Sequence, residues 1–168
     1  PHQNAPDADT LAISNIGVTA SEADGESITG YMVVNVIDDE PVANDDDAQS
    51  VDEGGLAIGG NVINPDAADD ANGSGKDLGG ADGAVLTHVN FGAGFVALTS
   101  GTETAPGSGV YGFSTANGSY TFSASGAWTF TPNAGLVNPA DASFDYRLTD
   151  GDGDTAEATQ PITVNDGE

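Results

Sequence analysis

Residues Gly118–Asn133 read GSYTFSASGAWTFTPN, in which two runs of alternating apolar and polar residues flank a short loop at positions 124–126. Alternation with a period of two is typical of β-strands that bury one face. A three-residue loop places Phe122 opposite Trp128, whereas a two-residue turn would shift this pairing by one residue. The segment therefore predicts a hairpin with a bulged turn, in which Gly126 adopts a left-handed conformation.

The aromatic residues of this hairpin share one face. In the same register Tyr120 lies opposite Phe130. Together with Phe122 and Trp128, these residues form a stripe of four rings. Each ring buries on the order of 150 to 250 Å², an area that a small sandwich can hardly leave exposed. The stripe is predicted to be core, and a sugar-stacking platform is the alternative.

The rest of the chain has the same character. Gly, Asp and Asn separate short alternating runs, and nowhere do apolar residues keep a helical period over several turns. The number and spacing of the runs predict an all-β protein, a β-sandwich. The expected strands are Leu11–Val18, Tyr31–Ile37, Gln49–Asp52, Val85–Phe91, Phe95–Thr99, Val110–Ser114, Ser119–Ser123, Ala127–Thr131, Ser143–Thr149 and Ala156–Val164.

An internal repeat sets the expected domain organisation. Ser21–Glu40 (SEADGESITGYMVVNVIDDE) aligns without a gap with Thr149–Glu168 (TDGDGDTAEATQPITVNDGE), at the displacement of 128 residues that separates Glu22 from Asp150. Such a repeat is the length of a small domain, so the chain is expected to come from a tandem array. Residues 1–40 are expected to be the tail of a preceding repeat, or N-terminal strands packed on the main domain, and residues 41–168 a complete repeat. Two strands alone are marginal in water, so the tail would pack on the following domain, be completed by further sequence or add to the same sandwich.

Charge excludes several partners. The chain has 27 acidic residues against Lys76 and Arg147, and a formal charge of −25. It lacks the basic patch that nucleic acid or anionic membrane requires. Its apolar runs are far too short to insert into a membrane, and without cysteine it contains no disulfide. Folding is expected to depend on counter-ions.

The sequence DGDGD carries the first of four acidic clusters, at Asp150, Asp152 and Asp154. Alternating Asp and Gly let the chain curl so that carboxylates converge, as Ca²⁺ with its six to eight oxygen ligands requires. The EF-hand pattern is absent, because it would need Gly at Thr155 and Glu at Pro161. A solvated polar turn is the alternative reading.

The second cluster lies in the junction IDDEPVANDDD around Pro41, where a bound cation would lock one repeat against the next. A flexible acidic linker is the alternative. Because the final VNDGE matches the start of this junction, Asp166 corresponds to its first carboxylate. The candidate ligands from the junction are Asp38, Asp39, Glu40, Asp45 and Asp46, and Asp47 also belongs to it.

Two further clusters are less specific. A long loop allows a calcium site, a binding loop or disorder, and it carries Asp66, Asp69, Asp70, Asp77 and Asp82. The triplet Glu22, Asp24 and Glu26 is the earlier copy of Asp150–Asp154, and Asp24 is its candidate ligand. If only one of the two copies binds the ion, the later copy is expected to do so.

The sequence offers no catalytic constellation. It has no Cys nucleophile, and His2 and His88 are isolated. The acidic pairs fall in loops and linkers, whereas the carboxylates of glycosidases face each other across a substrate cleft. The protein is therefore not expected to be an enzyme.

Three stretches together resemble a known group: VIDDEPVANDDDAQSVDEGG, YTFSASGAWTFTPN and FDYRLTDGDGDTAEATQPITVND. They look like the cadherin-like or immunoglobulin-like (VCBS-type) extender repeats of large bacterial RTX adhesins exported by type I secretion. The resemblance implies an immunoglobulin/cadherin-like Greek-key β-sandwich that Ca²⁺ makes rigid. It also implies that Asp150, Asp152 and Asp154, with Asp38, Asp39 and Asp45, are calcium ligands.

The function implied is a non-catalytic structural domain of a secreted adhesin at the bacterial cell surface, supporting adhesion and biofilm formation. Its partners would be neighbouring repeats of the same chain, with host or surface glycans bound through other domains, and it would be a monomer. A carbohydrate-binding module of a secreted protein is the alternative, favoured if Trp128 or Tyr111 were exposed beside an acidic loop.

Overall fold

The computed structural model describes residues 10–37, 39–65, 75–80, 82–137 and 139–167. The chain divides into two compact units, Pro1–Asp39 and Glu40–Glu168. The strands and the one short 3-10 helix are β1 (Thr10–Ser21), β2 (Ser27–Ile37), β3 (Gln49–Asp52), β4 (Ile58–Asn61), β5 (Ala84–Asn90), β6 (Val96–Ala97), η1 (Leu98–Ser100), β7 (Thr102–Glu103), β8 (Val110–Ser114), β9 (Gly118–Ser123), β10 (Ala127–Pro132), β11 (Ala140–Asp141), β12 (Phe144–Asp150), β13 (Thr155–Gln160) and β14 (Ile162–Asn165).

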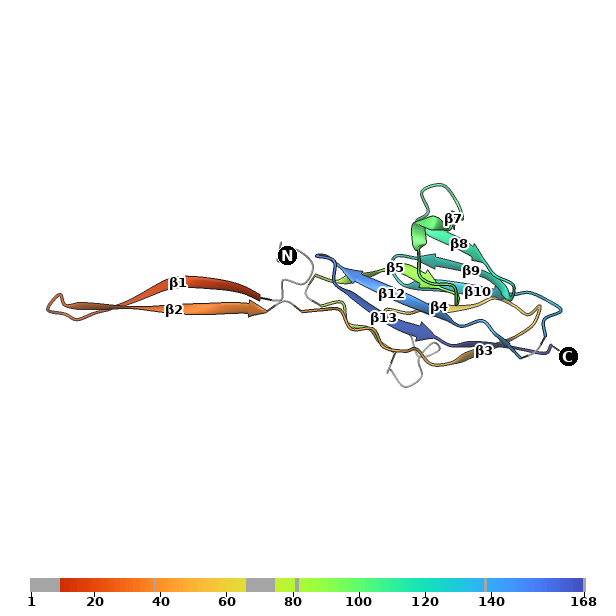
Figure 1. Ribbon diagram of the computed structural model, residues 1–168, viewed down its shortest axis with the longest axis horizontal. Helices are drawn as coiled ribbons and strands as arrows, with labels where there is room; N and C mark the ends of the chain where they lie inside the picture. The colour runs from red at the N-terminus through yellow and green to blue at the C-terminus, as the bar shows by residue number, and fades with distance from the viewer. Residues whose placement is uncertain (1–9, 38, 66–74, 81, 138, 168) are drawn as a thin grey trace. The chain divides into compact units, whose positions relative to one another are not determined.

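The first unit is an antiparallel hairpin. Among the residues that the structure describes, β1 and β2 pair only with each other, as a two-stranded sheet, and Figure 1 draws them as a long narrow ribbon. The pairing shifts by one residue between Ile13 and Ile16, where Asn15 has a left-handed backbone with φ of 62°. An Asn at a bulge is physically reasonable, because its short side chain tolerates this conformation better than most.

The second unit is a β-sandwich. One layer is a five-stranded sheet in the order β4-β10-β9-β8-β7. The other layer combines a four-stranded sheet, β13-β12-β5-β6, with a three-stranded sheet, β11-β14-β3. β13 passes into β14 at Pro161, which has no N–H to donate to a ladder, so the chain leaves one sheet and enters the next there.

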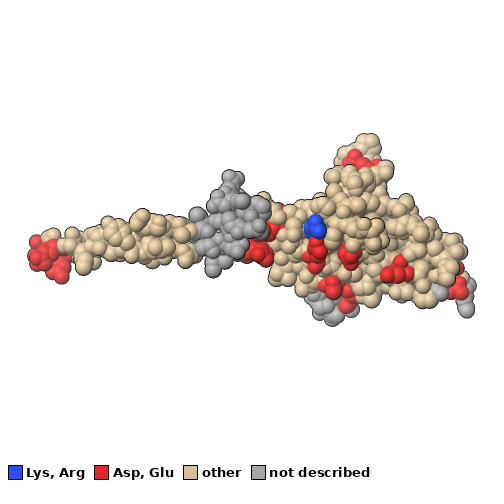
Figure 2. All heavy atoms as spheres, in the orientation of Figure 1, with Lys and Arg blue, Asp and Glu red and all other residues tan. Residues whose placement is uncertain are grey.

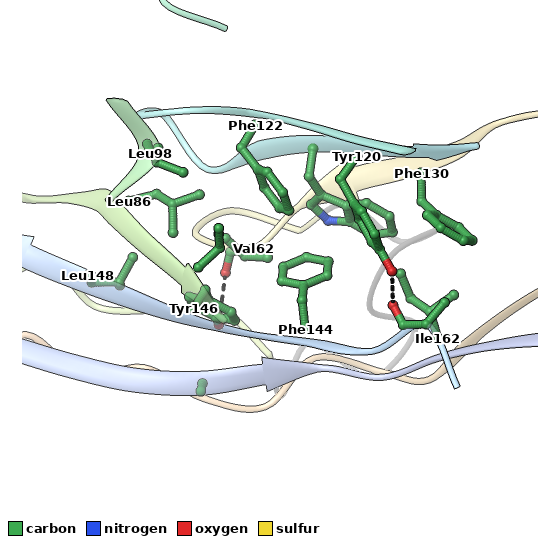
Figure 3. Packing of buried hydrophobic residues seen from close by; sticks show 14 of the residues in the cluster. Val62, Leu86, Leu98, Tyr120, Phe122, Phe130, Phe144, Tyr146, Leu148 and Ile162 are labelled. Atoms are coloured by element: carbon green, nitrogen blue, oxygen red, sulfur yellow. Dashed lines mark hydrogen bonds between the residues drawn. The ribbon is translucent and has the colours of Figure 1, made fainter. Parts of the chain in front are cut away.

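The core lies between these layers. Figure 3 shows Phe122, Tyr120 and Phe130 of the five-stranded sheet pointing toward the opposite layer, which carries Phe144 and Tyr146 of β12 and Ile162 of β14. Tyr120, Phe122, Trp128 and Phe130 are at most 2% exposed, so the prediction that the aromatic stripe is core is confirmed. The register is also as predicted, with Phe122 opposite Trp128, Tyr120 opposite Phe130 and a φ of 88° at Gly126. The polar end of Tyr120 is satisfied because its hydroxyl donates to the Ala142 carbonyl at 2.7 Å.

Some strand predictions were wrong in detail. The expected strand Phe95–Thr99 is a two-residue strand followed by η1, and Ala156–Val164 is two strands rather than one. β4, β7 and β11 were not predicted. β4 has the sequence IGGN, in which glycines replace the usual side-chain alternation: Gly59 lies against the β10 backbone, where a Cβ would come 2.4 Å from the Trp128 carbonyl oxygen.

Within the described residues, no helix is long and apolar enough to cross a membrane.

Candidate functional site

The turn between β12 and β13 contains the sequence Asp150–Asp154. The backbone N–H of Asp150 donates to the Asp154 carbonyl at 3.1 Å and closes the turn. Inside it, the Asp150 carboxylate Oδ1 accepts from the N–H groups of Gly153 (3.0 Å) and Asp154 (2.8 Å). Gly153 has a φ of 114°, a conformation that L side chains rarely adopt, so glycine is needed for the chain to curl at this position.

This turn brings three carboxylates together. Asp150, Asp152 and Asp154 are half-buried, and each has a carboxylate oxygen within 4.8 Å of the others. A fourth acidic residue lies beside the turn backbone, because a Cβ added to Gly151 would lie 3.5 Å from an Asp82 carboxylate oxygen. The grouping of Asp82 with this turn was not predicted, since the sequence places it in a separate loop. Several carboxylate oxygens converging on one point suit a hard cation such as Ca²⁺.

The turn between β1 and β2 repeats this arrangement. Glu22, Asp24 and Glu26 also have carboxylate oxygens within 4.8 Å of one another, but all three are exposed. The N–H of Glu22 donates to the Glu26 carbonyl at 2.8 Å, the counterpart of the bond that closes the later turn. Figure 2 shows acidic atoms gathered at this end of the hairpin, whose strands carry none.

Gly25, with a φ of 96°, takes the place of Gly153. The two turns therefore share backbone form and acidic character, and they differ in burial and in the length of the side chains.

The junction residues are not brought together in the same way. Asp38 lies outside the described residues, Asp39 and Glu40 belong to different units, and Asp166 is exposed after β14. Asp45 and Asp46 belong to the sandwich, where Asp45 Oδ1 accepts from the Thr159 N–H at 2.8 Å and the Asp46 N–H donates to the Thr159 carbonyl at 3.0 Å. Among the described residues, the two turn triplets are the only groups of three possible ligands whose carboxylate oxygens lie within 4.8 Å of one another.

A buried polar network lies beside this stretch. Asp77 is 4% exposed and accepts from the Asn44 N–H at 2.7 Å and from the Tyr146 hydroxyl at 3.1 Å. Burial raises the pKa of the Asp77 carboxyl to about 7, although both hydrogen bonds lower it. Burial also raises the pKa of Tyr146 above its usual range, and the nearby carboxylates of Asp46 and Asp77 add to this.

From the sequence, Asp77 is expected in a loop with several possible roles, and this network is not predicted. The available signal was Tyr146, since a tyrosine on the buried face of a strand needs a partner for its hydroxyl. The other acidic residues of that loop, Asp66, Asp69 and Asp70, lie outside the described residues.

A comparison with protein families identifies the class of this fold. The family described as "Bacterial Ig domain" matches residues 38–165, which cover most of the chain and all of the sandwich strands. The chain belongs to this family of bacterial immunoglobulin-like domains, as its β-sandwich also indicates. None of the curated proteins compared with the chain matches it. Domains of the family are generally structural and non-catalytic, and they are often extracellular or at the cell surface.

Proposed function

We propose that this protein is a calcium-binding structural domain of a secreted adhesin on the bacterial cell surface. In this role it is one of a series of immunoglobulin-like domains that hold a ligand-binding part of the adhesin away from the cell, in adhesion and biofilm formation. Its membership of the bacterial immunoglobulin-like family supports the structural role. The observation that carries the proposal is the convergence of Asp150, Asp152 and Asp154 at the turn after β12.

The charge of the chain supports a bound cation. Two carboxylates about 4 Å apart repel by roughly 4 kcal/mol at an effective dielectric constant of about 20. A whole domain is stable by only about 5 to 15 kcal/mol, so a few clusters without counter-ions weaken the fold substantially. Neutralising the turn would hold β12 and β13 together at their exposed ends.

The experiment is thermal unfolding of the 168-residue chain in millimolar Ca²⁺ and in EDTA, followed by the fluorescence of Trp128, the only tryptophan. A ligand present at a hundred times its Kd stabilises the folded state by about 2.7 kcal/mol. We expect Ca²⁺ to raise the Tm by several degrees. Equal melting curves in Ca²⁺ and EDTA would contradict the proposal.

Two matched variants separate specific binding from general charge screening. Asp152→Asn removes one carboxylate from the turn, while Asp150, whose Oδ1 organises the turn backbone, stays intact. Asp52→Asn removes the same charge from the exposed face of β3. Asp152→Asn should abolish most of the response to Ca²⁺, and Asp52→Asn should keep it. An equal loss in both variants would show that Ca²⁺ only screens charge.

The carbohydrate-binding alternative has less support. It needs an exposed aromatic platform, but Trp128 is 2% exposed and packs against Phe144, and Tyr111 is half-buried. A glycan array with this domain alone is therefore expected to give no binding. Specific binding to one class of glycan that is lost in Tyr111→Ala would favour that alternative.

A further inference from the structure

One face of the β1–β2 hairpin is apolar, and most of its large side chains are exposed. Strand alternation places Ile28, Gly30, Met32, Val34 and Val36 of β2 on one face. Across from them on β1 lie Ala20, Val18, Ile16 and Ile13. Neither strand has a charged side chain, in a chain with a formal charge of −25. An isolated two-stranded hairpin is at best marginally stable in water, so this face needs a cover.

The hairpin repeats the pairing of β12 with β13. Moving each β12–β13 pair back by the repeat displacement of 128 residues gives a pair that β1 and β2 form. Phe144 opposite Gln160 becomes Ile16 opposite Met32, and Leu148 opposite Ala156 becomes Ala20 opposite Ile28. The same holds for all six pairs of the later hairpin, and the acidic turn follows at the same place. The two hairpins are thus the same structural element.

Burial is where the two copies differ. Tyr146, Gln160 and Ile162 are at most 1% exposed, because this face of β12 to β14 lies against the core of the sandwich. Their counterparts on the hairpin, Val18, Met32 and Val34, are 58%, 49% and 38% exposed. The positions that are core in one copy are therefore apolar and uncovered in the other.

We infer that β1 and β2 are the last strands of a second immunoglobulin-like sandwich, and that the rest of that sandwich docks on their apolar face. The occupant is a segment of the same polypeptide on the N-terminal side of Thr10, equivalent to β3 to β11 of this chain. It supplies a facing sheet that covers Ile16, Val18 and Met32, as β9 and β10 cover β12 through the contacts of Phe122 and Trp128 with Phe144.

The same equivalence predicts strand partners at the edges. In the sandwich, β12 pairs on its other side with β5, antiparallel, and β14 pairs with β3, parallel. The occupant should therefore add an antiparallel strand along β1 and a parallel strand along Val34–Ile37. These additions would cover hairpin edges that lack the charged residues with which exposed edge strands are usually protected.

Two observations indicate which polypeptide segment covers the apolar face of the hairpin. In this chain the strands that cover β12 and β13 precede them in the sequence, and only Ala142 and Ser143 separate β11 from β12. The equivalent strands for the hairpin therefore lie upstream of β1. A second copy of this chain is a poor occupant, because its own β12 to β14 already fill the same place in its sandwich.

The test compares the 168-residue chain with the natural polypeptide extended upstream by one repeat length. Met32, the only methionine of this chain, reports on the apolar face through its rate of oxidation by hydrogen peroxide, located by peptide mass spectrometry. We expect Met32 to be oxidised at least tenfold more slowly in the extended polypeptide. Equal rates, or an upstream segment that does not fold as a sandwich with β1 and β2, would overturn the inference.

Neighbouring valines provide the matched control. Val34 lies on the apolar face and corresponds to the buried Ile162, whereas Val33, 60% exposed, lies on the opposite face and corresponds to Pro161. In the extended polypeptide, Val34→Lys should restore fast oxidation of Met32 and Val33→Lys should not. Trp128 fluorescence checks that the downstream sandwich stays folded in both.

Sedimentation of the 168-residue chain tests the remaining occupant. A stable dimer that protects Met32 and is lost in Val34→Lys would make a second copy the cover, and would also overturn the inference. All of these measurements are made in both Ca²⁺ and EDTA, so that failure of the proposed calcium site can be told apart from failure of this inference.

Discussion

The hairpin β1–β2 and the hairpin β12–β13 have the same register and the same acidic turn, yet one is core and the other is exposed. Pairing and turn geometry are set locally, by alternating side chains and by glycines with positive φ. Burial is set by what covers the strands: the apolar face of β12 and β13 lies in the sandwich core, whereas the apolar face of β1 and β2 is exposed. The same hairpin is therefore buried in one place and exposed in the other, and we expect its stability to differ accordingly.

The largest expected difference between the hairpins is in side-chain truncation. Phe144 contacts the rings of Phe122 and Trp128, with centroid distances of 4.9 and 5.5 Å. Phe144→Ala should lower the free energy of unfolding of the sandwich by about 3 to 5 kcal/mol, the usual cost of a buried Phe. Ile16→Ala, at the equivalent position, should change it by less than about 0.5 kcal/mol.

Urea unfolding followed by Trp128 fluorescence measures both variants. A large loss of unfolding free energy in Ile16→Ala would contradict this expectation, because it would mean that the stability of the sandwich depends on packing by the hairpin.

The second difference is the buried hydrogen bond that the Tyr146 hydroxyl donates to Asp77. The equivalent residue of the first hairpin, Val18, has no hydroxyl and cannot form such a bond. Because burial raises the pKa of Asp77 from 3.8 to about 7, the fold favours its protonated form. Its contribution to stability is therefore complete below about pH 4 and is lost as the pH rises through 7, a change of about 4 kcal/mol.

Asp77→Asn should remove this loss, since an amide keeps an oxygen for the Asn44 N–H and carries no charge. The measurement is the urea midpoint of both proteins from pH 4 to pH 8, in EDTA. The variant should gain stability relative to the wild type as the pH rises. A constant difference across this range would show that Asp77 titrates normally in the fold.

The third difference concerns the two acidic turns. The later turn has shorter, half-buried carboxylates and Asp82 beside it, while the earlier turn is exposed. Asp152→Asn should therefore remove most of the stabilisation by Ca²⁺, about 2.7 kcal/mol at a hundredfold excess over Kd, and Asp24→Asn should remove little of it. Calorimetric titration with Ca²⁺ checks this, and a larger loss of affinity in Asp24→Asn would reverse the assignment.

The smallest expected effect is at the outer faces. Arg147 and Glu157 form an ion pair at 2.6 Å, with Arg147 also over the Phe95 ring at 4.4 Å. At the same place in the first hairpin, Thr19 and Thr29 share a hydrogen bond of 2.8 Å. Replacing Arg147 and Glu157 together by Thr should cost less than about 1 kcal/mol, because exposed ion pairs contribute little. Urea unfolding at low and high salt measures this, and a cost of several kcal/mol would show that the outer face is also part of the core.

Much of the fold could be predicted from the sequence. The register and the turn of the aromatic hairpin Gly118–Asn133 were predicted correctly, because alternation, loop length and one glycine determine both. The grouping of the acidic turn triplets was also predicted, since their carboxylates are close in sequence. β4 was missed because two glycines hide its alternation, and the Asp77 network was missed because its partners are 33 and 69 residues away.

Amide hydrogen exchange of the 168-residue chain, read by NMR, tests the central comparison most directly. We expect amides in the β12–β13 ladder to exchange only through unfolding of the whole sandwich. Those in the equivalent β1–β2 pairs should exchange orders of magnitude faster, because their apolar face is uncovered. Equal protection of the two hairpins would contradict the claim that the same hairpin is stable only when a facing sheet covers it.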